Sequence, residues 1–489
     1  MNRLTKMMQT THKVLGTLLS ILFLVWFLSG LVMIYHTFPK VSQADRLARM
    51  DLLSHRSLPD IATMEQHREI QEPIRQLSLS SYMGQTCFQV GGGSASQLIP
   101  ADSSEQLPAI DEAYLRSVAS RWNPAPVARI DTLNQLEQWI PFGSLKREFP
   151  IYKFHFADAE KHQLYLSSQS GNVLQYTDRK SRFWAWLGAI PHWIYFTSLR
   201  QDVKLWSDVV VWLSGIGCLM CVAGLYMGIR AWLIGRRRGQ LSPYKKFWYK
   251  WHYLTGLLFG LPVLTFCFSG MMSLSRVQEW GIEAKLPFQP MQELQKLAPA
   301  PADYPLDYRQ VIEAYPMQIR QMEWSHFGSI PLYKLYTDQG EQVIDARQAG
   351  KVVPLQLTAD EVVNMLSEIH TDKPTEVKLI DRYDSYYIHA KRKLDLPVWK
   401  ITFNDVDKSC YYVHPLTGQC RYVNRPARWN HWSYPALHSL HFRLLADHPL
   451  LWSLVMWCLM IGGTFVSLSG VWLTGGWLAR LWSKRKARC

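Results

Sequence analysis

The chain repeats one stretch of sequence, first as Thr11-His12-Lys13-Val14-Leu15-Gly16 and again as Trp251-His252-Tyr253-Leu254-Thr255-Gly256. In both copies the stretch leads without a gap into an apolar run that ends in a Ser-Gly pair, Ser29-Gly30 and Ser269-Gly270. The spacing from the histidine to the Ser-Gly pair is the same in the two copies. The sequence therefore predicts two related helices, each of which opens with a histidine.

Four apolar runs are long enough to cross a bilayer, which takes about 20 residues of α-helix. They cover residues 14–34, 205–229, 253–273 and 450–473 of a chain of 489 residues. The first is longer than the apolar core of a secretory signal peptide, and no small-residue cleavage site follows it. The sequence thus predicts an integral membrane protein with four transmembrane helices.

The basic residues lie beside these apolar runs. The chain carries a formal net charge of +14, and its basic clusters precede the first run, separate the second from the third, and follow the fourth. Positive residues mark the cytoplasmic side of a membrane protein. We therefore expect a multi-pass protein of the bacterial inner membrane, with both termini in the cytoplasm and segments 41–204 and 275–449 in the periplasm. Because the bilayer explains the clusters, no nucleic-acid partner is expected.

The duplication extends beyond the opening helices. At a slightly larger constant offset, the matched positions are Arg182 with Arg428, Trp186 with Trp432, His192 with His438, Phe196 with Phe442, Gly217 with Gly463, and Gly224 with Gly470. Just before them, Tyr165 matches Tyr412 and Gly171 matches Gly418. The chain is therefore predicted to be two tandem copies of one unit with the same topology, related by a pseudo-two-fold axis along the membrane normal.

The two long outer segments are predicted to contain both helices and strands. Residues 111–122 are predicted to be helical, and Thr358 followed three residues later by Glu361 has the pattern of a helix start. Strands are predicted from alternation and turn signals at residues 152–156, 163–167, 331–336, 342–345, 398–403 and 411–414.

The expected order of regions follows from the spans and the repeat. It is a cytoplasmic N-terminus with the first helix (1–40), a periplasmic domain (41–181), an interfacial segment (182–204), the second helix (205–229), a basic loop (230–252), the third helix (253–274), a second periplasmic domain (275–427), a second interfacial segment (428–449), the fourth helix (450–473) and a basic tail (474–489).

Sixteen histidines are present, and the duplication singles out four of them. Only His12 with His252, and His192 with His438, match histidine to histidine. The first pair lies at the cytoplasmic end of the helices and the second at the outer end. Neutral imidazole is the commonest metal ligand, haem iron is held by axial ligands, and helix bundles build cofactor sites from facing helices. The pattern predicts two haem b groups, each held by one pair.

Other interpretations remain open at this point. A duplicated histidine could stabilise a helix end without any cofactor. Zinc is disfavoured because no third or fourth ligand is duplicated with either pair, and the absence of a C-x-x-C-H motif excludes c-type haem. The pairing itself is not fixed, since His36 at the outer end of the first span and His441 close to His438 are possible substitutes as axial ligands.

These motifs together resemble the PepSY-associated transmembrane family. The resemblance rests on the His-x-x-x-Gly helices that end in Ser-Gly, on Pro191-His192 and Leu437-His438 before the even-numbered helices, and on residues 411–418, Tyr-Tyr-Val-His-Pro-Leu-Thr-Gly, which are similar to the PepSY strand–turn signature. Residues 165–171 are a weaker counterpart that ends in Ser-Gly. The family includes iron-regulated inner-membrane proteins, similar to the di-haem ferric-siderophore reductase.

The resemblance implies two periplasmic PepSY-like domains, two haems b, and histidine ligands at His12, His252, His192 and His438. It further implies that electrons from a quinol or a cytoplasmic reductant reach a periplasmic ferric chelate or siderophore, and that reduction releases the iron. The alternative is a non-enzymatic PepSY membrane regulator or peptidase-binding protein. A permease built from two half-transporters is a further rival, although no buried acid–base pair in the spans would couple ion movement.

Overall fold

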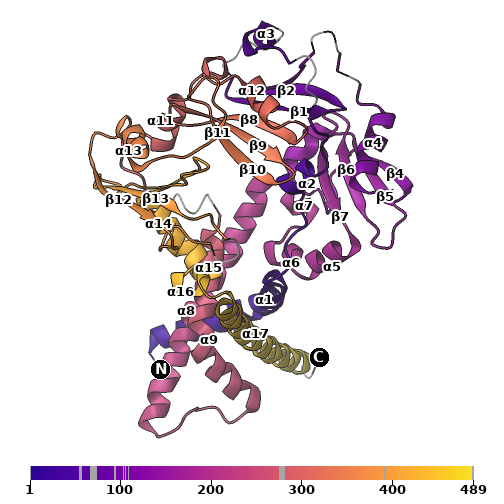
Figure 1. Ribbon diagram of the computed structural model, residues 1–489. Helices are drawn as coiled ribbons and strands as arrows, with labels where there is room; N and C mark the ends of the chain where they lie inside the picture. The colour runs from indigo at the N-terminus through magenta and orange to yellow at the C-terminus, as the bar shows by residue number, and fades with distance from the viewer. Residues whose placement is uncertain are drawn as a thin grey trace.

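The computed structural model describes residues 2–486 except 54–57, 67–73, 93–94, 103, 105, 108, 275–280 and 390–392. Four long helices form a stem, and the strands with their short helices form a head at one end of it (Figure 1). The stem helices are α1 (Arg3–Met33), α8 (Val203–Arg237), α9 (Phe247–Met272) and α17 (Pro449–Lys486). Each is long and apolar enough to cross a membrane, so the prediction of four spanning helices is confirmed.

The stem helices run further than the predicted spans at the end away from the head, which we call the basic end. α1 begins at Arg3, α8 continues to Arg237 and α17 to Lys486, because lysine and arginine are good helix formers in water. His12 and His252 consequently lie inside α1 and α9. The expectation that each histidine opens its helix was wrong for this reason.

The stem is a ring of four helices. α1 contacts α8 and α17, and α9 contacts the same two helices, so α1 and α9 face each other across the ring. Phe23, Phe27 and Phe266 belong to the buried core between them. The ring therefore places the two copies of the opening stretch on opposite sides of one central axis.

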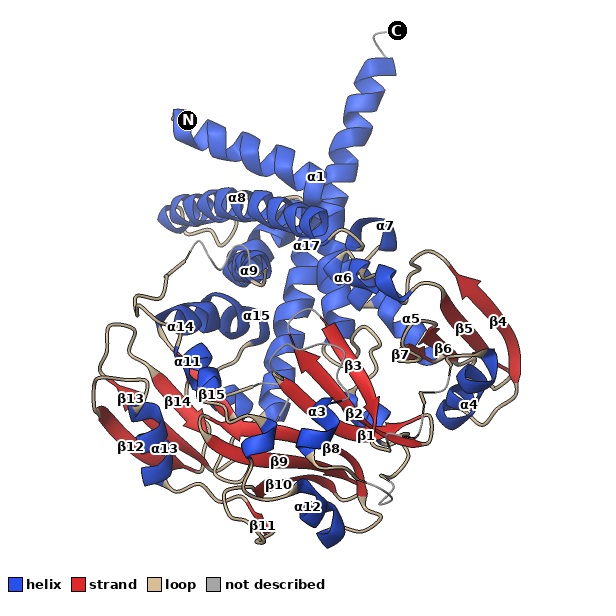
Figure 2. Cartoon of the chain, turned by 90° about the horizontal axis from the view of Figure 1, so that it is seen from above, coloured by secondary structure: helices blue, strands red, loops and turns tan. Residues whose placement is uncertain are grey.

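The head contains three antiparallel sheets. Figure 2 shows two four-stranded sheets on opposite flanks of a seven-stranded sheet. The first flank has the order β4-β5-β6-β7 and the second β12-β13-β14-β15. Their strands are β4 (Val127–Leu133), β5 (Ile151–Phe156), β6 (Gln163–Ser167), β7 (Val173–Thr177), β12 (Pro374–Ile380), β13 (Val398–Phe403), β14 (Cys410–Val413) and β15 (Cys420–Val423).

The seven-stranded sheet takes strands from both long segments. Its order is β11-β10-β9-β8-β1-β2-β3, and β1 pairs with β8 so that Leu77 lies opposite Trp324 and Leu79 opposite Met322. The strands are β1 (Gln76–Tyr82), β2 (Gln85–Gly92), β3 (Ala95–Pro100), β8 (Ile319–Phe327), β9 (Ile330–Thr337), β10 (Gly340–Asp345) and β11 (Val353–Pro354). The expectation of two separate domains did not foresee this shared sheet, whose core joins residues from both segments.

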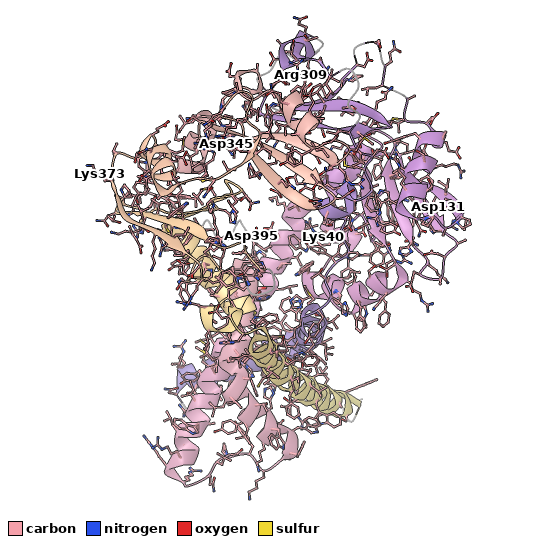
Figure 3. All side chains as sticks on the ribbon, viewed as in Figure 1. Lys40, Asp131, Arg309, Asp345, Lys373 and Asp395 are labelled. Carbon is pink, nitrogen blue, oxygen red and sulfur yellow. The ribbon has the colours of Figure 1, made fainter. Side chains whose placement is uncertain are left out.

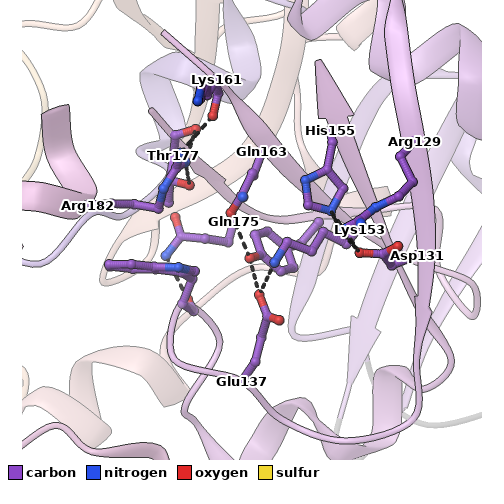
Figure 4. Close-up of polar contacts among 12 residues, drawn as sticks. Arg129, Asp131, Glu137, Lys153, His155, Lys161, Gln163, Gln175, Thr177 and Arg182 are labelled. Atoms are coloured by element: carbon purple, nitrogen blue, oxygen red, sulfur yellow. Dashed lines mark hydrogen bonds and ion pairs between the residues drawn. The ribbon is translucent and has the colours of Figure 1, made fainter. Parts of the chain in front are cut away.

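The two flanking sheets carry matching polar clusters. In the first, Glu137 accepts hydrogen bonds from the Lys153 ammonium at 2.7 Å and from the Tyr165 hydroxyl (Figure 4). In the second, the matching positions are occupied by Asp384, Lys400 and Tyr412, with the tyrosine hydroxyl donating to the carboxylate at 2.7 Å and the lysine 3.3 Å from it. The same chemistry at matching positions is what duplicated strands would retain.

Short helices cover the sheets, and charged side chains such as Lys373, Asp131 and Arg309 lie at the edge of the head (Figure 3). The predicted capping box exists, because the Thr358 hydroxyl accepts from the Glu361 amide while the Glu361 carboxylate accepts from the Thr358 amide. The head helices are α2 (Gln43–Leu47), α3 (Ile61–Gln66), α4 (Glu112–Trp122), α11 (Pro290–Lys296), α12 (Tyr308–Ala314) and α13 (Ala359–Ser367), with 3₁₀ turns at Gly143–Glu148 and Pro301–Asp303.

Two series of short helices connect the head to the stem. The first comprises α5 (Arg179–Leu187), α6 (Ala189–Trp193) and α7 (Thr197–Arg200). The second comprises α14 (Arg425–His431), a π-helical turn (Trp432–Ala436), α15 (Leu437–Ser439) and α16 (Arg443–Ala446). They occupy the predicted interfacial segments and bring His192 and His438 to the top of the stem.

Candidate functional site

The structure brings His12 and His252 together inside the basic end of the stem. His12 comes from α1 and His252 from α9, and their ring centroids lie 6.1 Å apart with an interplanar angle of 40°. We call these two residues the basic-end pair. They face each other because α1 and α9 are the opposite helices of the ring.

His192 and His438 form a second pair where the stem meets the head. They come from α6 and α15, with ring centroids 6.2 Å apart and an interplanar angle of 63°. We call them the head-side pair. The four duplicated histidines are therefore two facing pairs at two levels of one bundle.

The spacing within each pair leaves a gap between the rings. Rings in direct stacking contact are closer, as His36 on Trp184 shows at 4.5 Å. A first-row metal ion binds an imidazole nitrogen at about 2.0–2.1 Å, and that nitrogen lies about 1.1 Å from the ring centre, so two rings on opposite sides of one ion would have centroids about 6.3 Å apart. Both pairs are close to this separation.

Hydrogen bonds fix the tautomer of the basic-end pair. The Nδ1–H of His12 donates to the Met220 carbonyl at 3.0 Å. His252 Nδ1 lies 2.9 Å from the Ser469 hydroxyl, which itself donates to the Val466 carbonyl and so accepts from the ring. With the proton on Nδ1, Nε2 carries the lone pair in both rings. Histidine ligands to metals are commonly oriented by such a bond from the other ring nitrogen.

The head-side pair has the same arrangement. His192 Nδ1 lies 3.1 Å from the Trp26 carbonyl and 3.2 Å from the Ser29 hydroxyl. His438 Nδ1 lies 3.0 Å from the hydroxyl of Ser269, which donates to a backbone carbonyl of its own helix. Ser29 and Ser269 are the serines of the two repeated Ser-Gly pairs. All four imidazoles therefore present Nε2 as the nitrogen that can bind a metal.

A glycine lies against each of the four rings. A Cβ built on Gly224 would meet the His12 ring at 2.6 Å, and one on Gly30 would meet the His192 ring at 3.5 Å. For His252 and His438 the glycines are Gly470 and Gly270, with distances of 3.6 and 3.7 Å. Gly224 matches Gly470, and Gly30 matches Gly270, so the sequence match includes these glycines as well as the histidines.

Each pair lines a cavity. The cavity at the basic end measures about 500 Å³ and the head-side cavity about 640 Å³, within the range of cofactor sites. Gly256 lines the basic-end cavity, and a Cβ there would have no atom within 4 Å. Phe23 and Val263, which match each other in the repeat, line both cavities. One layer of side chains therefore separates the two cavities.

The residues present fit a haem at each level. The paired Nε2 atoms would hold the iron of such a group, and the glycines and apolar walls would leave room for it. Lys13 and Arg480 line the basic-end cavity and offer positive charge to carboxylates. Within the described residues, no three His, Cys, Asp or Glu side chains are grouped to hold a metal ion by themselves.

The two substitute histidines lie outside the two pairs. His36 stacks on Trp184 and does not line the head-side cavity, whereas His441 lines that cavity with its ring 4.9 Å from that of His389. Sequence reasoning identified Ser29 and Ser269 only as part of the repeated Ser-Gly pairs and gave them no role beside the histidines, although their repetition was a usable signal. It missed His389 and Arg421, which also line the head-side cavity, because neither is duplicated.

The fold and the two histidine sites define a four-helix membrane protein with a β-rich head. The family model for the PepSY-associated TM region matches residues 9–480. The chain therefore belongs to the PepSY-associated transmembrane family, which confirms the resemblance drawn from the sequence. Comparison with curated proteins gives no match.

Proposed function

We propose that the protein is a haem b oxidoreductase of the bacterial inner membrane that passes electrons to a ferric chelate, or siderophore, in the periplasm and so releases iron. The observation that carries the proposal is the matched construction of the two pairs. Each has a gap of the size that one ion fills, two oriented Nε2 atoms and two glycines against the rings. A pair kept only to stabilise helix ends would not need these features at both levels.

The chain's own groups have defined tasks in this proposal. The histidine pairs would hold the haems, which would supply one-electron transfer when bound. The Nδ1 hydrogen bonds hold the rings in place and raise the basicity of the ligating nitrogen. The apolar stem core around Phe23, Phe27 and Phe266 excludes water from the space between the levels. Because Phe23 and Val263 are the layer shared by both cavities, electrons have a short path from one level to the other.

We also propose the orientation and the symmetry. Arg3, Lys6 and Arg236 lie at the basic end of the stem helices, which supports a cytoplasmic basic end and a periplasmic head. The matching pairs, glycines and polar clusters support two tandem copies about an axis along the membrane normal. The donor, a quinol or a cytoplasmic reductant, would meet the basic-end pair. A quinol loses two electrons and two protons and reduces two ferric ions.

The test is the visible spectrum and redox titration of the full chain purified in detergent. We expect a Soret band, sharp reduced α and β bands, two haems per chain and oxidation of the reduced protein by a ferric chelate. His192→Ala should remove one of two titrating components and leave the other. A colourless, folded preparation would refute the proposal and favour the non-enzymatic regulator.

A further inference from the structure

The head-side cavity reaches beyond its histidine pair into only one half of the head. Among the described residues that line it, those from the head sheets and their loops are Ile388, His389 and Arg421, all from the second half. No described residue between 41 and 178 lines it. The cavity therefore opens on one side, although the stem beneath it is built from matched halves.

The first half shows why the opening is one-sided. His431 and His441 line the cavity in the second half, and Arg421 joins them from β15. Ala185 and Tyr195 occupy the first-half positions that match His431 and His441, and both pack in one apolar core, although Tyr195 also lines the cavity.

The strand register matches Arg421, opposite Tyr412, with Gln175, opposite Tyr165. Gln175 is buried, and its side chain donates to two backbone carbonyls of the first half. The second half therefore has two histidines where the first has Ala185 and Tyr195, and an exposed arginine where the first has a buried, hydrogen-bonded glutamine. The second half thus contains a site that the repeat did not require.

The chemistry of this mouth is that of an anion site. Arg421 is the only Asp, Glu, Lys or Arg among the described lining residues. The carboxylate that acts on its guanidinium, Asp384, is already engaged with Lys400 and with the Tyr412 hydroxyl. Arg421 is exposed at the mouth. Its planar guanidinium can donate two parallel N–H hydrogen bonds to the two oxygens of a carboxylate or a similar oxygen ligand.

The histidines around Arg421 add donors. The rings of His389 and His441 lie 4.9 Å apart. His431 is buried, and burial together with the charge of Arg421 lowers its pKa, which keeps the imidazole neutral and able to donate one N–H. Since the described residues form no metal site of three or more ligands, an iron ion would arrive here with its own ligands.

We propose that Arg421, His389 and His441 bind the ferric substrate at the mouth of the head-side cavity and select chelates with net negative charge. This inference rests on the proposed function and adds its substrate class, a ferric complex of anionic oxygen donors such as carboxylates. The chelate binds beside the head-side pair, where its Fe(III) takes up one electron and becomes Fe(II).

Binding of redox-inert Ga(III) complexes to the full-length protein tests the inference without electron transfer. Isothermal titration should show tighter binding of anionic Ga(III) citrate than of a neutral Ga(III) trihydroxamate. Arg421→Gln should weaken citrate binding about tenfold, as loss of a charge-assisted hydrogen bond does, and leave trihydroxamate binding unchanged. Arg421→Lys should restore part of the loss. Arg382→Gln, an exposed arginine of the same half that does not line the cavity, is the matched control and should bind as wild type.

The outcomes separate this inference from the proposed function. Equal binding of the two complexes, or equal loss in the Arg421→Gln and Arg382→Gln proteins, overturns the inference while the haem spectrum still stands. Loss of haem from Arg421→Gln with unchanged citrate binding assigns Arg421 to the haem carboxylates and also overturns it. A colourless wild-type protein refutes the proposed function, whatever the Ga(III) binding shows.

Discussion

Gly224→Ala tests whether the position of the His12 ring is what makes the basic-end site. The new Cβ would lie 2.6 Å from His12 Cε1 and 2.8 Å from Nδ1, whereas carbon atoms in contact prefer about 3.5–4.0 Å. The ring must therefore move by about 1 Å. A shift of that size takes Nδ1 out of hydrogen-bond range of the Met220 carbonyl, now at 3.0 Å, and carries Nε2 away from a metal.

The fold should survive this change. Overpacking costs about 1–3 kcal/mol, and alanine is about 1 kcal/mol better than glycine inside a helix, so the two effects largely offset each other. Gly470→Ala is the matched control, because it sits at the corresponding position of α17 and its Cβ would meet the His252 ring at an ordinary 3.6 Å.

The assay is haem content, the reduced α-band and a redox titration of both variants. We expect Gly224→Ala to lose one of the two titrating components, or to convert it to a high-spin form, and Gly470→Ala to keep both. If Gly224→Ala keeps both components at wild-type potentials, or if both variants lose the same component to the same extent, the assignment of His12 as an axial ligand is wrong.

Two further perturbations follow from the hydrogen bonds. Ser269→Ala removes the hydrogen bond between the serine hydroxyl and the His438 ring, so we expect about 10–100-fold weaker retention of the head-side haem. Haem transfer to apomyoglobin measures this retention, and a transfer rate equal to that of the wild type would contradict the expectation. In the head, burial opposes ionisation of Asp384, but hydrogen bonds from neighbouring groups nevertheless lower its pKa. Its ionised form therefore stabilises the fold at pH values above the ordinary carboxyl pKa, and this contribution is lost as pH falls below about 4. In Asp384→Asn, Tm should decrease less steeply with falling pH than in the wild type. An unchanged dependence of Tm on pH would contradict this expectation.

Much of the stem and of the histidine pairs was accessible from the sequence, because the sequence contains matching residues at constant offsets. His12 and His252 each look like ordinary helix residues, and only their match marks them. Helix ends were less accessible, since α1 continues through polar residues that contribute no apolar signal. The rings' hydrogen bonds to Met220 and Trp26 use backbone carbonyls, which no side-chain pattern reveals.

The same reliance on duplication hid the asymmetric parts of the molecule. Arg421 and His389 have no histidine or arginine counterpart in the first half, so a search for matched residues passes over them. The pairing of β1 with β8 was equally inaccessible, because it joins residues far apart in sequence whose alternation is short. Leu77 and Leu79 are buried in the structure, where they lie opposite Trp324 and Met322.

The shared seven-stranded sheet also imposes an order on biogenesis. β1 (Gln76–Tyr82) is synthesised long before β8 (Ile319–Phe327), and α8 and α9 are made between them. Until β8 is delivered, one edge of β1 has unpaired backbone groups, and such an edge is prone to wrong pairing. The nascent first half must therefore wait, with an open strand edge, for a segment that follows two further stem helices. The edge of β1 would therefore be paired only after all of these segments have been correctly placed.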